Sequence, residues 1–317
     1  MSSLQSTVPS GSPAAPAGAG PSRKKAGPGL HWWSTRVLPL VPAVTMLLVF
    51  LAFPIIWSLY SSFTNIALTG SRAANPEFIG LGNYERLLQD PVFPKSVWLT
   101  VVFVLFSAIL GQNILGLFLA LVMRRASRAV ATFTSTVVIV AWILPEIVAA
   151  FAMYAFFIGE GTLNQALALV GIEGPSWLFA HPMVAVIFAN TWRGTAFSMM
   201  IYQAALSSVP PEVGEAARID GATTLRELFS ITLPMIRNSI ATNLMLITLQ
   251  TLSVFTIVFV MTAGGPSNRS MILPVYAYDQ AFGFLDIGYG SAIATVMLLV
   301  GVVFGVIYVR LLRPGRD

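Results

Sequence analysis

The sequence predicts an all-α polytopic membrane protein with six transmembrane helices. Hydrophobic residues make up 56% of its 317 residues and charged residues only 10%, against about 25% charged in ordinary soluble domains. Six apolar segments, near 37–60, 97–123, 130–158, 183–206, 236–262 and 290–312, each supply the roughly 20 residues that a membrane-spanning helix needs. A soluble fold of this size is excluded, because the chain has too little polar surface to cover it.

The first 30 residues differ in composition from the rest of the chain. They are rich in Ser, Pro, Ala and Gly, and such a segment cannot bury a core. We therefore expect residues 1–30 to be a disordered tail and residues 31–317 to be the six-helix domain. A cleaved signal peptide is the alternative, but the polar leader is too long and the following apolar run too extended for one.

The basic residues indicate how the chain is oriented in the membrane. Of the 18 Lys and Arg residues, thirteen lie in the tail, in or next to the connections 124–129 and 207–235, or at the end of the chain. Four lie in the opposite connections, and one, Arg193, lies inside the fourth span. The positive-inside rule then predicts that both termini and the connection 207–235 are cytoplasmic. Because the membrane topology explains where the basic residues lie, they argue against a nucleic-acid partner.

The chain lacks the residues for several kinds of chemistry. It has no cysteine, and its two histidines, His31 and His181, lie far apart in the sequence. The spans hold no cluster of His, Asp, Glu or Cys of the kind an intramembrane enzyme needs. None of the three lysines follows a glycine, so no phosphate-binding Gly-x-x-x-x-Gly-Lys motif is present. We expect no catalytic, cofactor or metal site here, and any ATP hydrolysis must come from another chain.

The connection 207–235 is the longest polar run between two strongly apolar segments, and we call it the coupling loop. Pro210 and Pro211 end the fourth span and suit the first turn of a new helix, with Ser208 as a possible cap. Gly221 suits the left-handed position that ends a helix. The sequence therefore predicts a first short helix that ends in a sharp turn.

A second short helix follows in the coupling loop. Thr224 and Glu227 have the capping-box spacing and predict where that helix begins. Pro234 is expected to end it before the fifth span. The loop should then be a helix–turn–helix element with a small-residue contact surface at Ala216, Ala217 and Gly221, which a partner can approach closely.

Three stretches resemble the membrane subunits of bacterial ABC importers. The run EAARIDGATTLRELFSITLP at 215–234 has the spacing of the cytoplasmic loop that docks on the ATPase subunit. The run FIGLGNYERLLQDPVF at 78–93, which predicts a structured loop with a short helix, is similar to the F-G-L-x-N-Y segment of carbohydrate-type subunits. The stretch that begins TAGGPSNRS at Thr262 is similar to their T-G-G-G-P segment, with Ala263 replacing the first glycine. The resemblance covers residues 37–312 and favours the maltose and glycerol-phosphate group.

The resemblance implies a type I ABC importer permease fold and a transport subunit that is not an enzyme. It implies that a sugar, oligosaccharide or polyol crosses the bacterial cytoplasmic membrane by alternating access. The implied partners are a second permease, two ATPase subunits that bind ATP and Mg²⁺, and an external solute-binding protein. The residues implied to dock on the ATPase are Glu215, Ala216, Ala217, Asp220, Gly221, Leu225, Leu228, Phe229, Ile231, Leu233 and Pro234. An importer of a polyamine, metal or peptide, and a passive channel, are the alternatives.

Several polar residues inside the spans are candidates for the transport pathway. Glu146 and Arg193 are predicted at middle depths, where an ionisable group is costly and usually has a partner or faces a cavity. They either form an ion pair that latches the pathway, contact the solute, or are purely structural. Asn190, Asn243 and Gln250 either bind a hydroxylated solute or join helices.

Aromatic residues of the last external connection and two glycines of the last span also suggest roles. Tyr276, Tyr278, Phe282 and Phe284 either receive a solute or binding protein, or anchor the chain at the membrane interface. Gly301-x-x-x-Gly305 in the last span predicts close helix packing.

Overall fold

The computed structural model describes residues 38–312, and these form helices joined by turns. The described residues contain no strand, only an isolated bridge between Thr64 and Phe78. The all-α class is therefore confirmed. The predicted tail, residues 1–30, and the basic residues Arg23, Lys24, Lys25, Arg36, Arg313 and Arg316 lie outside the described residues.

The chain divides into two units after Pro54. The first unit contains a 3₁₀ turn (Leu38–Leu40), α2 (Val41–Leu47), a π-helical segment (Leu48–Ala52) and the start of α3 (Phe53–Ser61). The helical run Val41–Ser61 is 21 residues long and apolar enough to cross a membrane. The first predicted span is therefore a helix of sufficient length.

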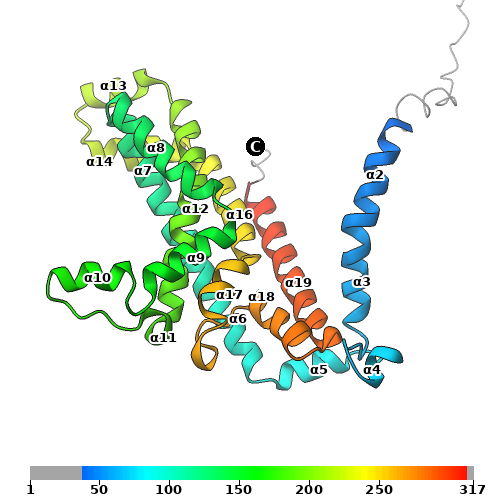
Figure 1. The fold of residues 1–317 in the computed structure, drawn as a ribbon. Helices are drawn as coiled ribbons and strands as arrows, with labels where there is room; N and C mark the ends of the chain where they lie inside the picture. Colours follow the sequence, from blue (N-terminus) through cyan, green and yellow to red (C-terminus); the bar gives the residue numbers. More distant parts are fainter. Residues whose placement is uncertain (1–37, 313–317) are drawn as a thin grey trace, which may run out of the picture. The chain divides into compact units, whose positions relative to one another are not determined.

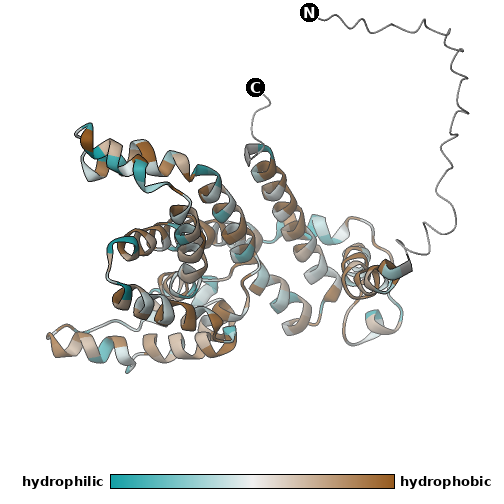
Figure 2. Cartoon of the chain, turned by 90° about the horizontal axis from the view of Figure 1, so that it is seen from above, coloured by the Kyte–Doolittle hydropathy of each residue, from teal (hydrophilic) through white to brown (hydrophobic). Residues whose placement is uncertain are grey.

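The second unit holds the other helices, in which hydrophobic residues are mixed with polar ones (Figure 2). Their bounds are α4 (Ser71–Ala74), α5 (Gly82–Gln89), α6 (Val92–Phe103), a π-helical segment (Val104–Gln112), α7 (Asn113–Arg125), α8 (Arg128–Ile143), α9 (Glu146–Phe157), α10 (Thr162–Leu169), α11 (Trp177–Ala180), α12 (Pro182–Ser207), α13 (Pro211–Ile219), α14 (Thr224–Glu227), a π-helical segment (Leu228–Thr232), α15 (Leu233–Met235), α16 (Arg237–Leu252), α17 (Thr256–Thr262), a 3₁₀ turn (Pro266–Asn268), α18 (Leu273–Tyr278), a π-helical segment (Asp279–Gly283) and α19 (Ile287–Leu312).

Each of the six predicted spans is helical in the structure. By length and composition, four helical segments of the described chain could cross a membrane: Val41–Ser61, Val92–Arg125, Glu146–Leu169 and Ile287–Arg310. A fifth consists of α16 and α17, which are bent by 46° relative to each other. The remaining predicted span corresponds to α12, which has 26 residues but carries several polar groups. The count of six is consistent with the structure.

The third predicted span, 130–158, is not one helix. It is broken between α8 and α9 at Leu144 and Pro145, neither of which has helical backbone angles. Proline lacks the N–H that a helix interior needs, and it disfavours helical angles in the residue before it. Glu146 therefore lies in the first turn of a new helix, not in the middle of a long one.

The two ends of the second unit differ in the elements they carry. The helices α13 and α14 lie at one end, beside the ends of α7 and α8, whereas α5, α10 and α11 lie at the opposite end (Figure 1). We call these the α13 end and the α5 end. A large apolar cluster that includes Phe103, Val186 and Tyr289 packs toward the α5 end, and a smaller one that includes Tyr202 and Ile236 packs toward the α13 end.

Small residues let the central helices approach closely. A Cβ added at Gly116 would lie 2.5 Å from the Ser198 Cβ, and one added at Gly194 would lie 2.3 Å from the Gln112 side chain. These glycines allow the 92–125 helix to pack against α12. The predicted close packing at Gly301 and Gly305 is not made within the described chain, because a Cβ at either position meets no atom within 4 Å.

The predicted short helix in the 78–93 loop is confirmed as α5. The buried Asn83 side chain donates hydrogen bonds to the Ser62 carbonyl at 2.9 Å and to the Thr64 carbonyl at 2.8 Å. The Tyr84 hydroxyl lies 2.7 Å from the Ser62 hydroxyl. These bonds tie the Asn-Tyr pair of the GLGNY run to the turn that follows α3.

A second set of contacts, which we call the clamp (Arg86, Asp90, Tyr276, Asp286 and Tyr289), holds α5 against α18 and α19. Asp90 accepts hydrogen bonds from the Tyr276 hydroxyl and, at 2.9 Å, from the Tyr289 hydroxyl. Arg86 donates to Asp286 at 2.8 Å, and its guanidinium lies 4.0 Å from the centre of the Tyr289 ring. The clamp joins residues almost 200 positions apart in the sequence.

The charge of Asp90 is stabilised within the clamp. Burial raises the pKa of its carboxyl, but the hydrogen bonds from Tyr276, the Val92 amide and Tyr289 outweigh this effect, so the pKa lies below its ordinary value. Burial and the hydrogen bond to Asp90 raise the pKa of Tyr276 well above its ordinary value. Tyr276 therefore stays a donor and Asp90 an acceptor over the whole physiological range.

Candidate functional site

The first half of the coupling loop is a short helix that ends in a sharp turn, as predicted. Pro211 occupies the first turn of α13, where its missing N–H costs nothing. Gly221 has a φ of 78°, which suits glycine. The Ala222 amide donates to the Ala217 carbonyl at 2.9 Å and the Gly221 amide to the Arg218 carbonyl at 3.1 Å. This pair of bonds is the Schellman motif that closes a helix.

Three local predictions in the coupling loop were wrong. The cap of α14 is Thr223, whose hydroxyl accepts from the Arg226 amide at 3.4 Å, and not Thr224. Ser208 does not cap α13, because it ends α12 and its hydroxyl donates back to the Ala205 carbonyl. The helical run continues through Pro234 and ends at Ile236. The π-helical segment before Pro234 changes the local bonding pattern, which explains how a proline fits there.

An ion pair joins the two arms of the coupling loop. The Arg218 Nε lies 3.5 Å from a Glu227 carboxylate oxygen, with the Arg218 side chain 65% exposed and that of Glu227 12% exposed. A Cβ added at Gly214 would lie 3.1 Å from the other Glu227 oxygen. Gly214 therefore leaves room for the Glu227 side chain beside α13.

The coupling loop exposes three large apolar side chains, those of Ile219, Leu225 and Phe229. Their exposed fractions are 86%, 68% and 65%. Large side chains of this kind are rarely left open together without a partner. Leu225 and Phe229 were predicted to dock from the sequence, but Ile219 was not. Its position one residue before the C-cap does not indicate from the sequence that it is exposed.

The other predicted docking residues divide by exposure. Ala217 is buried, so it does not belong to the predicted small-residue contact surface. Ala216 lies beside it and is exposed. Of the rest, the exposed residues are Glu215, Asp220, Gly221 and Pro234, and the half-buried ones are Leu228, Ile231 and Leu233.

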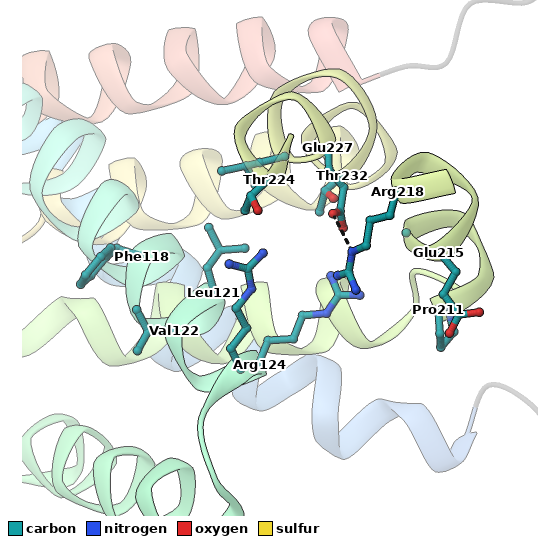
Figure 3. A pocket seen from close by; sticks show the side chains of 13 residues that line it. Phe118, Leu121, Val122, Arg124, Pro211, Glu215, Arg218, Thr224, Glu227 and Thr232 are labelled. Carbon is teal, nitrogen blue, oxygen red and sulfur yellow. Dashed lines mark ion pairs between the residues drawn. The ribbon is translucent and has the colours of Figure 1, made fainter. Parts of the chain in front are cut away.

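A pocket of about 390 Å³ lies between α7 and the two arms of the coupling loop (Figure 3). One wall is the last two turns of α7, with Phe118, Leu121, Val122, Arg124 and Arg125. The other wall comes from the coupling loop, with Pro211, Gly214, Glu215, Arg218, Thr224, Glu227, Leu228 and Thr232. The α7 wall therefore combines three apolar side chains with two arginines, and the coupling loop adds further charged groups.

Two of the predicted pathway residues are buried between helices. Asn190 is 4% exposed and donates to the Ser107 hydroxyl at 2.8 Å. Asn243 is fully buried and donates to the Ser198 and Tyr202 hydroxyls, each at 3.1 Å. In this conformation both amides join helices, as in the second of the two interpretations given for them, and do not face a solute. Gln250 is exposed.

Glu146 and Arg193 are both half-buried. One Glu146 oxygen and the Arg193 Nε are buried without a hydrogen-bond partner. Within residues 38–312, no ion pair links the two side chains in this conformation. Each group is therefore left with an unsatisfied polar atom, which is costly to bury.

Four aromatic rings form a ladder along α17, α18 and the segment that follows α18. The Phe255 and Phe259 rings are stacked with centroids 4.9 Å apart. Tyr278 lies 4.8 Å from Phe255 and 5.0 Å from Phe282. Phe259, Tyr278 and Phe282 are 37%, 38% and 53% exposed. Tyr276, by contrast, is buried in the clamp, so it cannot receive a solute.

A family model and several curated proteins match this chain. The model of the binding-protein-dependent transport system inner membrane component matches residues 112–317. The sulfoquinovosyl glycerol transport system permease protein of Agrobacterium fabrum is 34% identical over 87% of this chain and 90% of its own length. The trehalose/maltose transport system permease protein of Thermococcus litoralis is 31% identical over 88% of this chain and 94% of its own.

The fold is shared with a solved transporter chain. A chain in the crystal structure of a bacterial alginate ABC transporter, in complex with alginate pentasaccharide-bound periplasmic protein, superposes with a TM-score of 0.76. The match covers 90% of this chain and 96% of that one at 21% identity. The type of fold inferred from the sequence is therefore confirmed.

Proposed function

The chain belongs to the family of binding-protein-dependent transport system inner membrane components, and we propose that it moves a sugar, oligosaccharide or polyol. The direction of movement is inward, through the bacterial cytoplasmic membrane. The proposal treats the chain as the permease subunit of an ABC importer. Relatives named for sulfoquinovosyl glycerol and for trehalose and maltose support this solute class. Importers of a polyamine, metal or peptide and a passive channel are the rivals.

The observation that carries the proposal is the form of the coupling loop. Its two arms are fixed by the Gly221 turn and by the Arg218–Glu227 ion pair, and they present Ile219, Leu225 and Phe229 to solvent. A rigid element with an uncovered apolar surface is suited to dock on a partner. We assign that partner as the ATPase subunit, which binds ATP and Mg²⁺. A passive channel needs no such element.

The charges support an orientation with the α13 end in the cytoplasm. Six arginines lie at that end. Three are in or next to the connection between α7 and α8, and three are in or next to the coupling loop: Arg124, Arg125, Arg128, Arg218, Arg226 and Arg237. The four cations at or near the α5 end are bonded: Arg72 and Arg86 to Asp286, Lys95 to the Ser267 carbonyl, and Arg269 to the Ala180 carbonyl. An excess of Lys and Arg residues marks the cytoplasmic side of a membrane protein. Both termini would then be cytoplasmic.

The family description supports a solute-binding protein as a further partner, and we propose a second permease beside it. A solute-binding protein would deliver the solute at the α5 end, and a second permease would complete the pathway. Gly301 and Gly305 meet no atom of the described chain, which suits a surface that another helix approaches. The aromatic ladder and Gln250 are candidates to contact the sugar, because aromatic rings pack on the C–H faces of a sugar ring and an amide hydrogen-bonds its hydroxyl groups.

Glu146 and Arg193 remain candidates for a latch or for solute contact. Their unpartnered buried atoms favour a pair that forms in another conformation of the transport cycle. Exchanging the two charges should restore the uptake that each single substitution loses. If Glu146→Arg combined with Arg193→Glu is as inactive as the single variants, the latch is excluded.

The experiment that tests the proposed function is purification of the tagged chain from its native membrane in mild detergent, with the companions identified by mass spectrometry. An ATP-binding subunit and a second permease should be recovered. Cross-linking should be attempted from a cysteine at the exposed Ala216, since Ala217 is buried. A single chain with no ATPase, together with uptake that survives ATP depletion, would favour the channel instead.

A further inference from the structure

The pocket beside the coupling loop has features that docking on an ATPase does not require. Its α7 wall carries Phe118 and Val122, which are 58% and 46% exposed. Residues 96–123 contain no charged side chain, and Arg124 and Arg125 are the first charges after them. A long uncharged run that ends in arginines marks the place where a helix leaves the hydrocarbon core. The pocket therefore lies at the membrane surface.

The arginines of this pocket differ in whether they are paired. Arg218 is bonded to Glu227, as the dashed line in Figure 3 shows. Among the residues that the structure describes, neither Arg124 nor Arg125 takes part in an ion pair. The remaining acidic group, the Glu215 carboxylate, points away from Arg124 in Figure 3. The α7 side of the pocket thus offers two uncompensated positive charges above an apolar wall.

We propose that this pocket binds an anionic phospholipid of the membrane leaflet at the α13 end, with its phosphate on Arg124 and Arg125 and an acyl chain along Phe118 and Val122. Guanidinium groups recognise phosphate oxygens through paired hydrogen bonds. The Thr224 and Thr232 hydroxyls also line the pocket and suit the hydroxyls of a glycerol headgroup. That this leaflet is the cytoplasmic one rests on the proposed function.

A lipid fits the pocket better than the other sources of an anion. A free phosphate would satisfy the arginines but leave the apolar wall in water, which is unfavourable. A carboxylate of the ATPase would meet the same arginines, but it would leave exposed the apolar residues that lie on the membrane side of them. A phospholipid is the one molecule present at this depth that carries both an anion and an apolar chain.

A bound lipid would touch both arms of the coupling loop. Gly214 and Arg218 on α13 and Thr224 on α14 line the same pocket as the α7 arginines. The lipid would therefore hold the coupling loop against the end of α7. This gives a means by which the anionic lipid content of the membrane sets how firmly ATPase movements reach the helices.

The test is native mass spectrometry of the whole complex, extracted from its own membrane and then exchanged into detergent with phosphatidylglycerol or phosphatidylethanolamine added back. The wild type should retain phosphatidylglycerol in preference to phosphatidylethanolamine. Each arginine near a membrane surface contributes about 1 kcal/mol to binding of anionic lipid. The double variant Arg124→Gln with Arg125→Gln should therefore bind phosphatidylglycerol about 30-fold more weakly. Arg128→Gln, at an exposed arginine outside the pocket, is the matched control and should weaken binding by no more than about fivefold, the effect of one charge near the membrane surface.

A second measurement needs no variant. A phosphatidylglycerol with a photoreactive group in its acyl chain should label the wild-type complex at Phe118, Leu121 or Val122. Millimolar inorganic phosphate should leave this labelling unchanged, and full displacement by phosphate would show a free-anion site instead. Equal lipid retention in the double variant, or labelling elsewhere, would overturn the proposal. Loss of the ATPase subunit from the double variant without loss of lipid would assign the arginines to protein docking. None of these results depends on whether the complex transports a sugar.

Discussion

The two ends of the second unit satisfy their polar and apolar groups in opposite ways. At the α5 end, the clamp places Asp90, Tyr276 and Tyr289 in mutual hydrogen bonds, and Arg86 lies on the Tyr289 ring. At the α13 end, one ion pair joins the arms of the coupling loop and Ile219 is 86% exposed. The polar groups of the clamp find their partners within this chain, whereas the coupling loop exposes apolar side chains that no residue of the described chain covers.

Because of this difference, we expect the clamp to determine the stability of the chain and the coupling loop to determine its contact with the ATPase. Changes in the clamp should lower the free energy of unfolding and leave the contact with the ATPase unchanged. Changes in the coupling loop should do the reverse, because its exposed residues make few contacts within the chain.

The largest expected effect is that of Gly221→Asp. A Cβ at Gly221 meets no atom within 4 Å, and the residue has a φ of 78°, so within the chain the cost is only the backbone strain of about 1–2 kcal/mol for a left-handed residue. A charge in a docking contact costs about 2 kcal/mol or more. Uptake of labelled solute should therefore fall at least about 30-fold, while the amount of chain in the membrane stays the same.

Gly171→Asp is the matched control for that variant. Gly171 lies in the connection after α10, has a φ of 75°, and also has open space around its Cβ position. The same strain is introduced at the α5 end, away from the coupling loop. Uptake by this variant should stay within about twofold of the wild type. If both glycine variants lose uptake equally, strain and not docking is the cause.

The next largest effect is expected from Asp90→Ala, measured as the thermal unfolding temperature of the purified chain in detergent. Tyr276 and Tyr289 are at most 1% exposed, and their hydroxyls lie 3.2 Å apart. Without Asp90 they can bond only to each other, so one donor is left unsatisfied at a cost of about 1–3 kcal/mol. The unfolding temperature should fall, while recovery of the ATPase subunit stays unchanged.

Removing the two hydroxyls tests the cause of that loss. Adding Tyr276→Phe and Tyr289→Phe to Asp90→Ala should recover part of the unfolding temperature, because no donor is then left unsatisfied. No recovery would mean that Asp90 acts through Arg86 or the Val92 amide and not through the tyrosines.

The sequence predicts the fold well where apolar length decides, and poorly where contacts between distant residues decide. Six apolar segments placed the helices, and the Gly221 turn was found from its residues alone. The break at Pro145 was missed because a count of apolar residues passes through a proline, which membrane helices tolerate. The clamp could not be predicted, since it joins Asp90 to residues 186 and 199 positions away.

In the candidate site, too, local structure could be predicted from the sequence but burial could not. The local motif predicted a turn and two short helices, but burial reversed several assignments within it. Ala217 faces inward and Ile219 outward, and nothing in the spacing of the motif distinguishes them. Asn190 and Asn243 looked equivalent to Gln250 in an apolar span, and only the packing of the neighbouring helices shows that the first two are buried.

A smaller effect concerns pH. The pKa of Asp90 lies below its ordinary value in the folded chain, so its contribution to stability is complete above the unfolded pKa of about 3.9 and is lost as the pH falls through the folded pKa. The difference in unfolding temperature between the wild type and Asp90→Ala should be constant from pH 7 to about pH 5. It should shrink only below about pH 4. The effect is smaller than removal of Asp90, because a protonated carboxyl still accepts hydrogen bonds. A difference that already shrinks near pH 6 would contradict the assignment.

The smallest effect is expected at the ion pair of the coupling loop. Arg218 is 65% exposed and lies 3.5 Å from Glu227, and pairs as exposed as this contribute about 0.2–1 kcal/mol. Arg218→Glu or Glu227→Arg should therefore lower uptake by no more than about fivefold, and the double exchange should restore most of it. Arg226→Glu, an exposed arginine on α14 outside the ion pairs of the described residues, controls for the added charge. If the exchange restores uptake and the Arg226 variant is unaffected, the ion pair sets the angle between the arms. If all three single variants lose uptake alike, the positive charge of this surface, and not its shape, is what the partner recognises.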